Sequence, residues 1–196
     1  MESGKKKLYQ NKDMTGGLTE FQQAISVAPD YYEAHYQVAM VSLTQGNSAE
    51  AEKSLRKSIE LSGDKYGDAD VRLGAILLDR GNFPEGEKII RQGIQLSPNF
   101  WLGHYELGRA SWNEKRIVEA LESTEHAQLL APNAPVVYRL LSNIHLQEKD
   151  YAALLQDIDE YLKLDPDSPA GIRSGELRGQ VQQKISAEHP AASATH

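Results

Sequence analysis

Apolar residues recur three and four positions apart along most of the chain, in stretches separated by short turns. This spacing gathers apolar side chains on one face of a helix, so the pattern predicts a series of amphipathic α-helices. Pro98, Pro132 and Pro166 follow three of these stretches at a constant interval. Proline ends a helix because it has no N–H group and restricts the residue before it. The pattern therefore predicts an all-α fold of regularly spaced helices.

The helical pattern is also a sequence repeat. Residues 34–39 (AHYQVA) match residues 103–108 (GHYELG), and residues 94–99 (IQLSPN) match residues 128–133 (QLLAPN). In this register the units begin at Tyr32, Gly67, Trp101 and Pro135, which are 35, 34 and 34 residues apart. A period near 34 residues with two helices per unit is typical of the tetratricopeptide repeat.

The chain resembles the tetratricopeptide-repeat family over about residues 8–168, and in style it is similar to bacterial multi-repeat scaffold proteins. The small residues at the eighth position of the repeat are Ala39, Gly74, Gly108 and Ser142. The apolar residues at the thirtieth position are Leu61, Leu96, Leu130 and Leu164. The resemblance implies a right-handed α-α superhelix, a solenoid, closed by a C-terminal capping helix. A plain helical bundle is the alternative.

The repeat register divides the chain into segments. The predicted segments are a partial repeat at 1–31 with its second helix at about 15–28, four repeats at 32–66, 67–100, 101–134 and 135–168, a capping helix at 169–185 and a disordered tail at 186–196. Either a short Lys-rich helix covers the partial repeat, or the chain is cut from a longer protein. The second interpretation is favoured, because half a repeat cannot bury its own apolar face.

The turns between paired helices change along the chain. Gly46 and Gly81 suit a left-handed backbone in the first two repeats. Lys115 and Lys149 stand at the same place in the later repeats. Those later turns are therefore expected to differ slightly.

The last repeat departs from the family by placing Leu154 and Tyr161 where alanine is usual. The helix that follows carries glycines four residues apart on one stripe, namely Gly171, Gly175 and Gly179. We expect this glycine stripe to accept the two bulky side chains. The alternative is a frayed, weakly docked helix, because each glycine costs a helix about 1 kcal/mol.

Composition narrows the function. The 21 basic and 28 acidic residues give a net charge of −7, which is unlike a nucleic-acid binder. The absence of cysteine excludes disulfides and thiolate chemistry. No apolar stretch of about 18 residues exists, so no membrane insertion is expected. Without a signal peptide either, the cytoplasm is the default expectation for the compartment.

The sequence contains no recognisable catalytic pattern, such as a phosphate-binding loop, a nucleophile elbow or a zinc-binding His-Glu-x-x-His. We therefore expect no enzyme activity, no cofactor and no metal. His35 and His104 occupy the fourth repeat position, which the family packs between helices, and His145 is also interpreted as a packing residue. Metal sites need several converging ligands, which scattered histidines do not provide.

The resemblance implies that the first helix of each repeat lines a concave groove. Trp112 lies in the third repeat near Tyr105 and Arg109, and Trp, Tyr and Arg are enriched at binding hot spots. The predicted partner-binding residues are Tyr36, Met40, Arg72, Tyr105, Arg109, Trp112, Arg139 and Asn143. An acidic group or a C-terminal carboxylate could pair with the arginines. The alternative is that Trp112 packs under a loop.

The sequence thus predicts a non-catalytic scaffold that binds a peptide or partner protein in the concave groove. One alternative is a structural segment that associates with itself, for which the N-terminal half-repeat is the candidate surface. Another is the targeting part of a larger multidomain protein.

Overall fold

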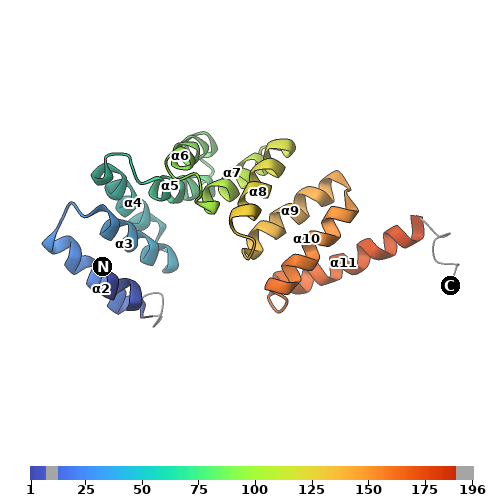
Figure 1. Ribbon diagram of the computed structural model, residues 1–196, viewed down its shortest axis with the longest axis horizontal. Helices are drawn as coiled ribbons and strands as arrows, with labels where there is room; N and C mark the ends of the chain where they lie inside the picture. Colours follow the sequence, from blue (N-terminus) through green and yellow to red (C-terminus); the bar gives the residue numbers. More distant parts are fainter. Residues whose placement is uncertain (8–12, 189–196) are drawn as a thin grey trace. The chain divides into compact units, whose positions relative to one another are not determined.

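The computed structural model describes residues 1–7 and 13–188, and its regular elements are helices (Figure 1). The chain forms two compact units, Met1–Glu106 and Leu107–His196. The first unit contains α1 (Glu2–Lys5), α2 (Met14–Val27), α3 (Tyr32–Thr44), α4 (Ser48–Ser62), α5 (Gly67–Asp79), α6 (Phe83–Leu96) and the start of α7 (Trp101–Asn113). The second contains the rest of α7, α8 (Ile117–Leu130), α9 (Pro135–Glu148), α10 (Tyr151–Leu164) and α11 (Pro169–Glu188).

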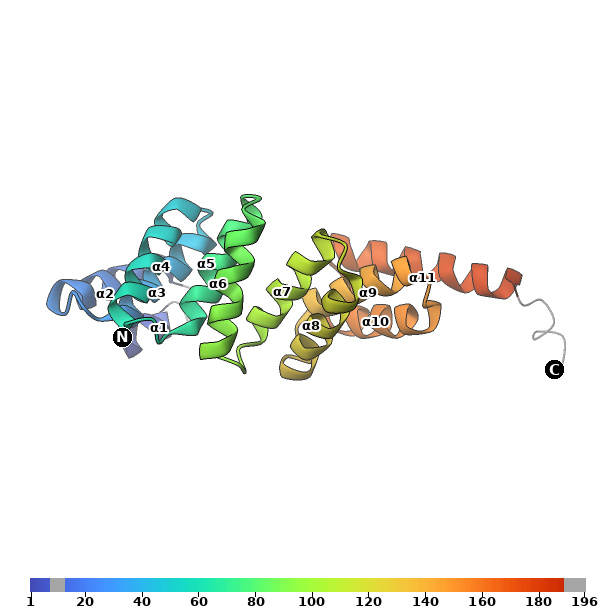
Figure 2. The same ribbon diagram turned by 90° about the horizontal axis from the view of Figure 1, so that it is seen from above.

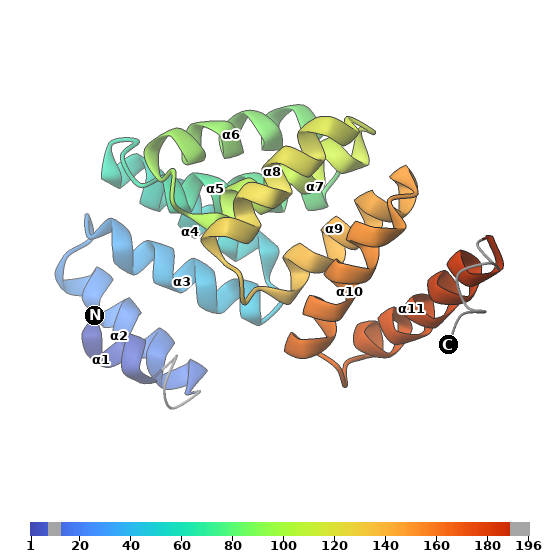
Figure 3. The same cartoon turned by 45° about the vertical axis from the view of Figure 1, so that its right-hand side comes forward.

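Helices pair as hairpins inside each unit. In the first unit α3 packs on α4 and α5 packs on α6, and in the second unit α9 packs on α10 (Figure 3). The core of the first unit joins successive hairpins, because Leu55 of α4 lies in one buried cluster with Ala39 of α3 and Leu73 of α5. None of the described helices has both the length and the hydropathy needed to cross a bilayer. These are the paired helices of a tetratricopeptide-repeat solenoid.

The hairpin of α5 and α6 depends on glycines where the two backbones meet. A Cβ on Gly93 would lie 2.7 Å from the carbonyl oxygen of Gly67, and a Cβ on Gly86 would lie 2.9 Å from that of Gly74. Real side chains do not tolerate such distances to backbone atoms. The small repeat positions therefore set how closely these helices approach.

The four turns between paired helices have the same geometry, which corrects the expectation that the later turns differ. Lys115 and Lys149 have φ values of 60°, close to the 74° of Gly46 and the 80° of Gly81. In each turn the N–H of this residue and the N–H of the next one bond to carbonyls of the preceding helix, which is a Schellman-type ending. The hydrogen bonds determine the conformation, and lysine adopts a backbone that usually favours glycine.

A short helix covers the N-terminal half-repeat. Gly4 of α1 lies against the ring of Phe21, and Met1 packs on the same cluster as Leu18. Phe21 is consequently fully buried. The helix α1 therefore shields part of the apolar face of α2.

The helix α11 lies alongside α10, and its predicted end at 185 falls short of its last residue, Glu188 (Figure 2). Val181 packs in one cluster with Leu154 and Ile158 of α10, and Nε of Arg178 donates to Oδ1 of Asp159 at 2.5 Å. The tail predicted at 186–196 thus starts within a helix. Its last part, residues 189–196, lies outside the described residues.

The predicted role of the glycine stripe is wrong. A Cβ on Gly175 or Gly179 would meet no atom within 4 Å, so these positions accept no bulky neighbour. Tyr161 is only 3% exposed, but its hydroxyl donates to Oδ2 of Asp165 at 2.9 Å, in the turn that leads to α11. Leu154 is covered by Val181, from the opposite face of the helix. The stripe fails because α11 presents Val181, not Gly175 or Gly179, to α10, while Gly171 approaches only the backbone of the turn after α10.

Candidate functional site

In three of the four repeats the residue at the fourth position connects the first helix to the end of the preceding second helix. Nε2 of His35 lies 3.0 Å from the carbonyl oxygen of Pro29, and Nε2 of His104 lies 2.8 Å from that of Pro98. Because a carbonyl oxygen only accepts, the histidines donate from Nε2. The hydroxyl of Tyr138 donates in the same way to the carbonyl oxygen of Pro132 at 2.9 Å. These two histidines therefore make structural contacts, as their repeat position predicts.

The second repeat places an acid where the other repeats place this donor. Asp70 is only 8% exposed, and its Oδ2 has no hydrogen-bond partner among the described residues. Burial, and to a lesser degree the nearby negative charge of Asp64, raise the pKa of Asp70 to about 6. Asp70 therefore carries a buried, poorly compensated charge at neutral pH.

A second buried acid lies in the second unit, at a position that the repeat pattern did not mark. Nδ1 of His145 on α9 lies 2.6 Å from Oδ2 of Asp157 on α10. Burial raises the pKa of Asp157 to about 6, and the contact with His145 opposes this rise. His145 is thus more than a packing residue, because it pairs two helices of one repeat. Its partner is twelve residues away, on a helix position that the family leaves unspecified.

Four of the predicted binding residues belong to the first unit. Tyr36 is 7% exposed, because its ring packs edge-on against Tyr66 with centroids 5.0 Å apart. Met40 packs against the same core cluster. The ring of Tyr105 lies beside that of Trp101, at a centroid distance of 6.1 Å. Tyr36 is therefore mainly a core residue, whereas Met40 and Tyr105 keep part of their surface in solvent.

Arg72, the fourth of these residues, has an unusual environment. Its guanidinium carbon lies 5.8 Å from the ring centroid of Phe100, within the range of a cation–π contact. Its Nε is buried and has no hydrogen-bond partner among the described residues. A buried guanidinium donor without an acceptor is costly. Arg72 as a residue is only partly buried, so its positive charge is available to a ligand carboxylate.

The other four predicted residues belong to the second unit. Arg109 and Trp112 lie on α7 and are partly buried, whereas Arg139 and Asn143 lie on α9 and are exposed. Arg139 and Asn143 are four residues apart on one helix, so they are neighbours on its surface. These two side chains together can donate several hydrogen bonds to a ligand.

An aromatic cluster beside the first-unit residues was not predicted. Tyr66 contacts Tyr32 at a centroid distance of 5.2 Å, in addition to its contact with Tyr36. Burial is the main cause that raises the pKa of the Tyr66 hydroxyl, which therefore stays protonated. Tyr31, Tyr66 and Phe100 directly precede three successive first helices. The repeat register contained this signal, because an aromatic residue recurs just before each of these helices.

The fold and these surfaces define a class: a helical-repeat protein whose regular backbone presents variable side chains on the first helices. Sequence comparison agrees, because the family described as "Tetratricopeptide repeat" matches at residues 32–65 and again at residues 71–135. The chain belongs to the tetratricopeptide-repeat family. A search of curated proteins by sequence finds no match.

Solved structures of repeat proteins share the fold at low sequence identity. PilF of Pseudomonas aeruginosa has a TM-score of 0.72 at 18% identity, covering 94% of this chain and 88% of that one. PilW, described as a type IV pilus biogenesis factor, has a TM-score of 0.70 at 12% identity, covering 95% and 90%. YrrB, described as a tetratricopeptide-repeat protein with an unusual peptide-binding site, has a TM-score of 0.60 at 16% identity, covering 86% and 87%.

Family membership sets the general class of function. The tetratricopeptide-repeat fold is generally a non-catalytic fold for protein interaction, so the chain is in general terms a protein-interaction scaffold. Among residues 1–7 and 13–188, no group of three His, Asp or Glu side chains could hold a metal ion.

Proposed function

We propose that the chain is a non-catalytic adaptor that binds a peptide or partner protein on the faces of its first helices. The ligand carries a carboxylate, either on an acidic side chain or at its C-terminus. In the first unit this carboxylate binds Arg72. The second unit offers a separate site, in which Arg139 and Asn143 bind polar groups of a ligand and Trp112 is the aromatic contact.

The observation that supports this proposal best is the environment of Arg72. A guanidinium stacked on Phe100 is held in place, and its buried Nε lacks an acceptor among the described residues. Arg72 as a residue is only partly buried, so a ligand carboxylate could form a charge-assisted hydrogen bond with its guanidinium group, which is stronger than a neutral one. Arg72 is also placed by packing, so little side-chain freedom is lost on binding.

The test is affinity capture from native cell extract followed by mass spectrometry, comparing the wild type with Arg72→Gln and with Trp112→Ala/Arg139→Ala. Each site variant is expected to reduce capture of a specific partner about tenfold, because each removes a charged hydrogen bond. Lys88→Gln is the matched control, since Lys88 is an exposed cation on α6, a second helix. Circular dichroism establishes that all four proteins are folded.

A partner that all the variants retain equally would refute binding through the first helices. Recovery of nothing except the chain itself would favour the self-associating alternative. Sedimentation velocity then checks that alternative, because self-association makes the sedimentation coefficient depend on concentration.

A further inference from the structure

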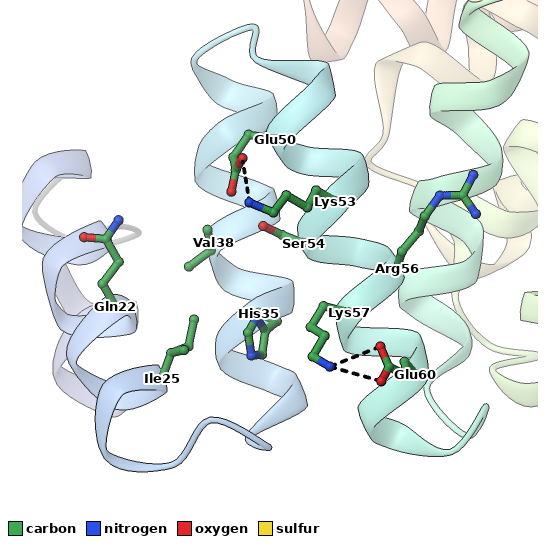
Figure 4. Close-up of a pocket in the computed structure, with 10 residues that line it drawn as sticks. All are labelled: Gln22, Ile25, His35, Val38, Glu50, Lys53, Ser54, Arg56, Lys57 and Glu60. Carbon is green, nitrogen blue, oxygen red and sulfur yellow. Dashed lines mark hydrogen bonds and ion pairs between the residues drawn. The ribbon is translucent and has the colours of Figure 1, made fainter.

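A cavity of about 540 Å³ lies in the first unit between α2 and α4, with α3 behind it (Figure 4). Gln22 and Ile25 form the α2 side, and His35 and Val38 of α3 lie at the back. Small-molecule and peptide side-chain sites have volumes of this order. Because α2 and α4 are both second helices, this cavity is separate from the first-helix face.

The two sides of the cavity differ in charge. On the α4 side the lining residues include the cations Lys53, Arg56 and Lys57, with Glu50 and Glu60 as the only acids that line it among the described residues. The α2 side is uncharged, since Glu20 is the single charged residue of α2 and pairs with Lys7 at 2.7 Å. The chain as a whole carries a net charge of −7. A local excess of cations in an acidic chain favours an anionic ligand.

The ion pairs on the α4 side leave two of these cations available. Nζ of Lys53 lies 3.9 Å from Glu50, and the Lys53 side chain is 79% exposed. Lys57 pairs with Glu60 at 3.0 Å, and both side chains are also exposed. Exposed pairs of this kind contribute little, so a ligand carboxylate can replace either glutamate at small cost.

Arg56 plays a different role, because its ion-pair partner Glu52 does not line the cavity. Its Nε donates to Glu52 at 2.9 Å, and Glu52 also pairs with Arg80, the residue after α5. This network fixes Arg56 on α4, while Figure 4 shows Lys53 extending toward the α2 side. Lys53 and Lys57, four residues apart on one helix, are therefore the cations that a ligand would contact.

The back of the cavity adds an apolar requirement. Val38 is 8% exposed and packs in one cluster with Ile25 and Phe21. The buried Ser54 lies beside these side chains and can offer a hydroxyl. A ligand that fills this space needs an apolar side chain between its anionic groups.

We propose that this cavity is a second binding site, which takes an acidic peptide segment of a partner protein. One apolar side chain of the segment contacts Ile25 and Val38, and flanking carboxylates bind Lys53 and Lys57. This site works independently of the first-helix face, so a partner can engage either surface without the other.

The probe is the peptide acetyl-Asp-Glu-Leu-Asp-Glu-amide, titrated into the full ¹⁵N-labelled chain and followed by amide chemical shifts. The expected shifts cluster at the amides of α2 and α4 that line the cavity, and they weaken at high salt. The neutral peptide acetyl-Asn-Gln-Leu-Asn-Gln-amide should bind at least about tenfold more weakly, because it lacks the carboxylates.

Lys53→Glu/Lys57→Glu should weaken binding of the acidic peptide about tenfold, since attraction becomes repulsion. Lys65→Glu/Lys88→Glu changes the net charge equally at exposed positions away from the cavity, and it should bind like the wild type. Gln22→Trp is an independent variant that narrows the cavity from the exposed α2 side and keeps every cation. It should also reduce binding.

The proposal is overturned if the acidic and neutral peptides bind equally, or if both charge-reversal variants lose binding to the same degree. It is also overturned if the shifts fall on α3 and α5 amides that do not line the cavity. A dimer seen by sedimentation without peptide, with broadened amides of α2 and α4, would assign the cavity to a second copy of this chain instead.

Discussion

At the scale of single residues, Asp70 is the clearest conflict between sequence and environment. His35, His104 and Tyr138 donate from this repeat position to a carbonyl, whereas a carboxylate cannot. The folded-state pKa of about 6 lies above the ordinary value of 3.8. The folded state therefore favours the protonated form of Asp70. The stability that this proton contributes is complete below about pH 4 and is lost as the pH rises through 6.

Asp70→Asn is thus expected to raise the free energy of unfolding by about 1–3 kcal/mol at pH 7 and to change it little at pH 4. The measurement is chemical denaturation followed by circular dichroism at both pH values. Asp157 titrates in the same range, but it is present in both proteins and cancels in the difference.

Asp68→Asn is the control for this comparison, because Asp68 lies in the same first turn of α5 and is more exposed. Removing its charge should be neutral or slightly destabilising, since a negative charge favours a helix N-terminus. Equal stabilisation by both variants would attribute the effect to general charge repulsion rather than to burial.

Lys115 and Lys149 adopt a backbone conformation that lowers the stability of the folded protein. Lys115 and Lys149 hold a left-handed conformation that favours glycine by about 1 kcal/mol. Lys115→Gly and Lys149→Gly are each expected to raise the free energy of unfolding by about 0.5–1 kcal/mol. This value already allows for the greater conformational entropy of glycine in the unfolded chain, which reduces the gain.

The reverse substitution tests this explanation within the same protein. Gly81→Lys should destabilise by a similar amount, because Gly81 has the same turn geometry and a Cβ at this position would meet no atom within 4 Å. Thermal midpoints of the three variants and the wild type provide the measurement. If Lys115→Gly lowers the midpoint, the lysine side chain makes a compensating contact that outweighs its backbone strain.

At the scale of helices, one substitution is expected to have opposite effects in two places. Gly93→Ala on α6 should destabilise by about 2–3 kcal/mol, because its Cβ would lie 2.7 Å from a backbone oxygen of α5. Gly175→Ala on α11 should stabilise by about 1 kcal/mol, because its Cβ meets open space and alanine favours a helix. Urea denaturation measures both. Destabilisation by Gly175→Ala would mean that α11 has a close neighbour at its glycines.

At the scale of the whole molecule, the sequence predicted the fold class and the family, because both depend on spacing. Apolar and small residues recur in a register that a helical hairpin requires, and family matching agrees. Contacts that depend on side-chain direction were less predictable. The glycine stripe followed the right helical spacing, but spacing alone does not say which stripe of α11 faces α10.

The same limit applies to the candidate site. Sequence register placed Arg72 on a first helix, but its contact with Phe100 and its unsatisfied Nε required three-dimensional positions. Tyr36 was expected in an open groove and is largely buried under Tyr66. Solvent exposure of a groove residue depends on the residue before the next helix, which the family pattern leaves variable.

The division of the chain into two units falls within α7, not at a repeat boundary. Gly103, in the first turn of that helix, lies close to Ile94 and Val71 of the first unit. Anyone recombining these repeats as interchangeable modules would naturally splice at Trp101. Such a splice would replace Gly103 with the residue that the donor repeat has at this position. Any side chain there would clash with Ile94. Chimeras joined in the α6–α7 turn should therefore retain glycine at position 103.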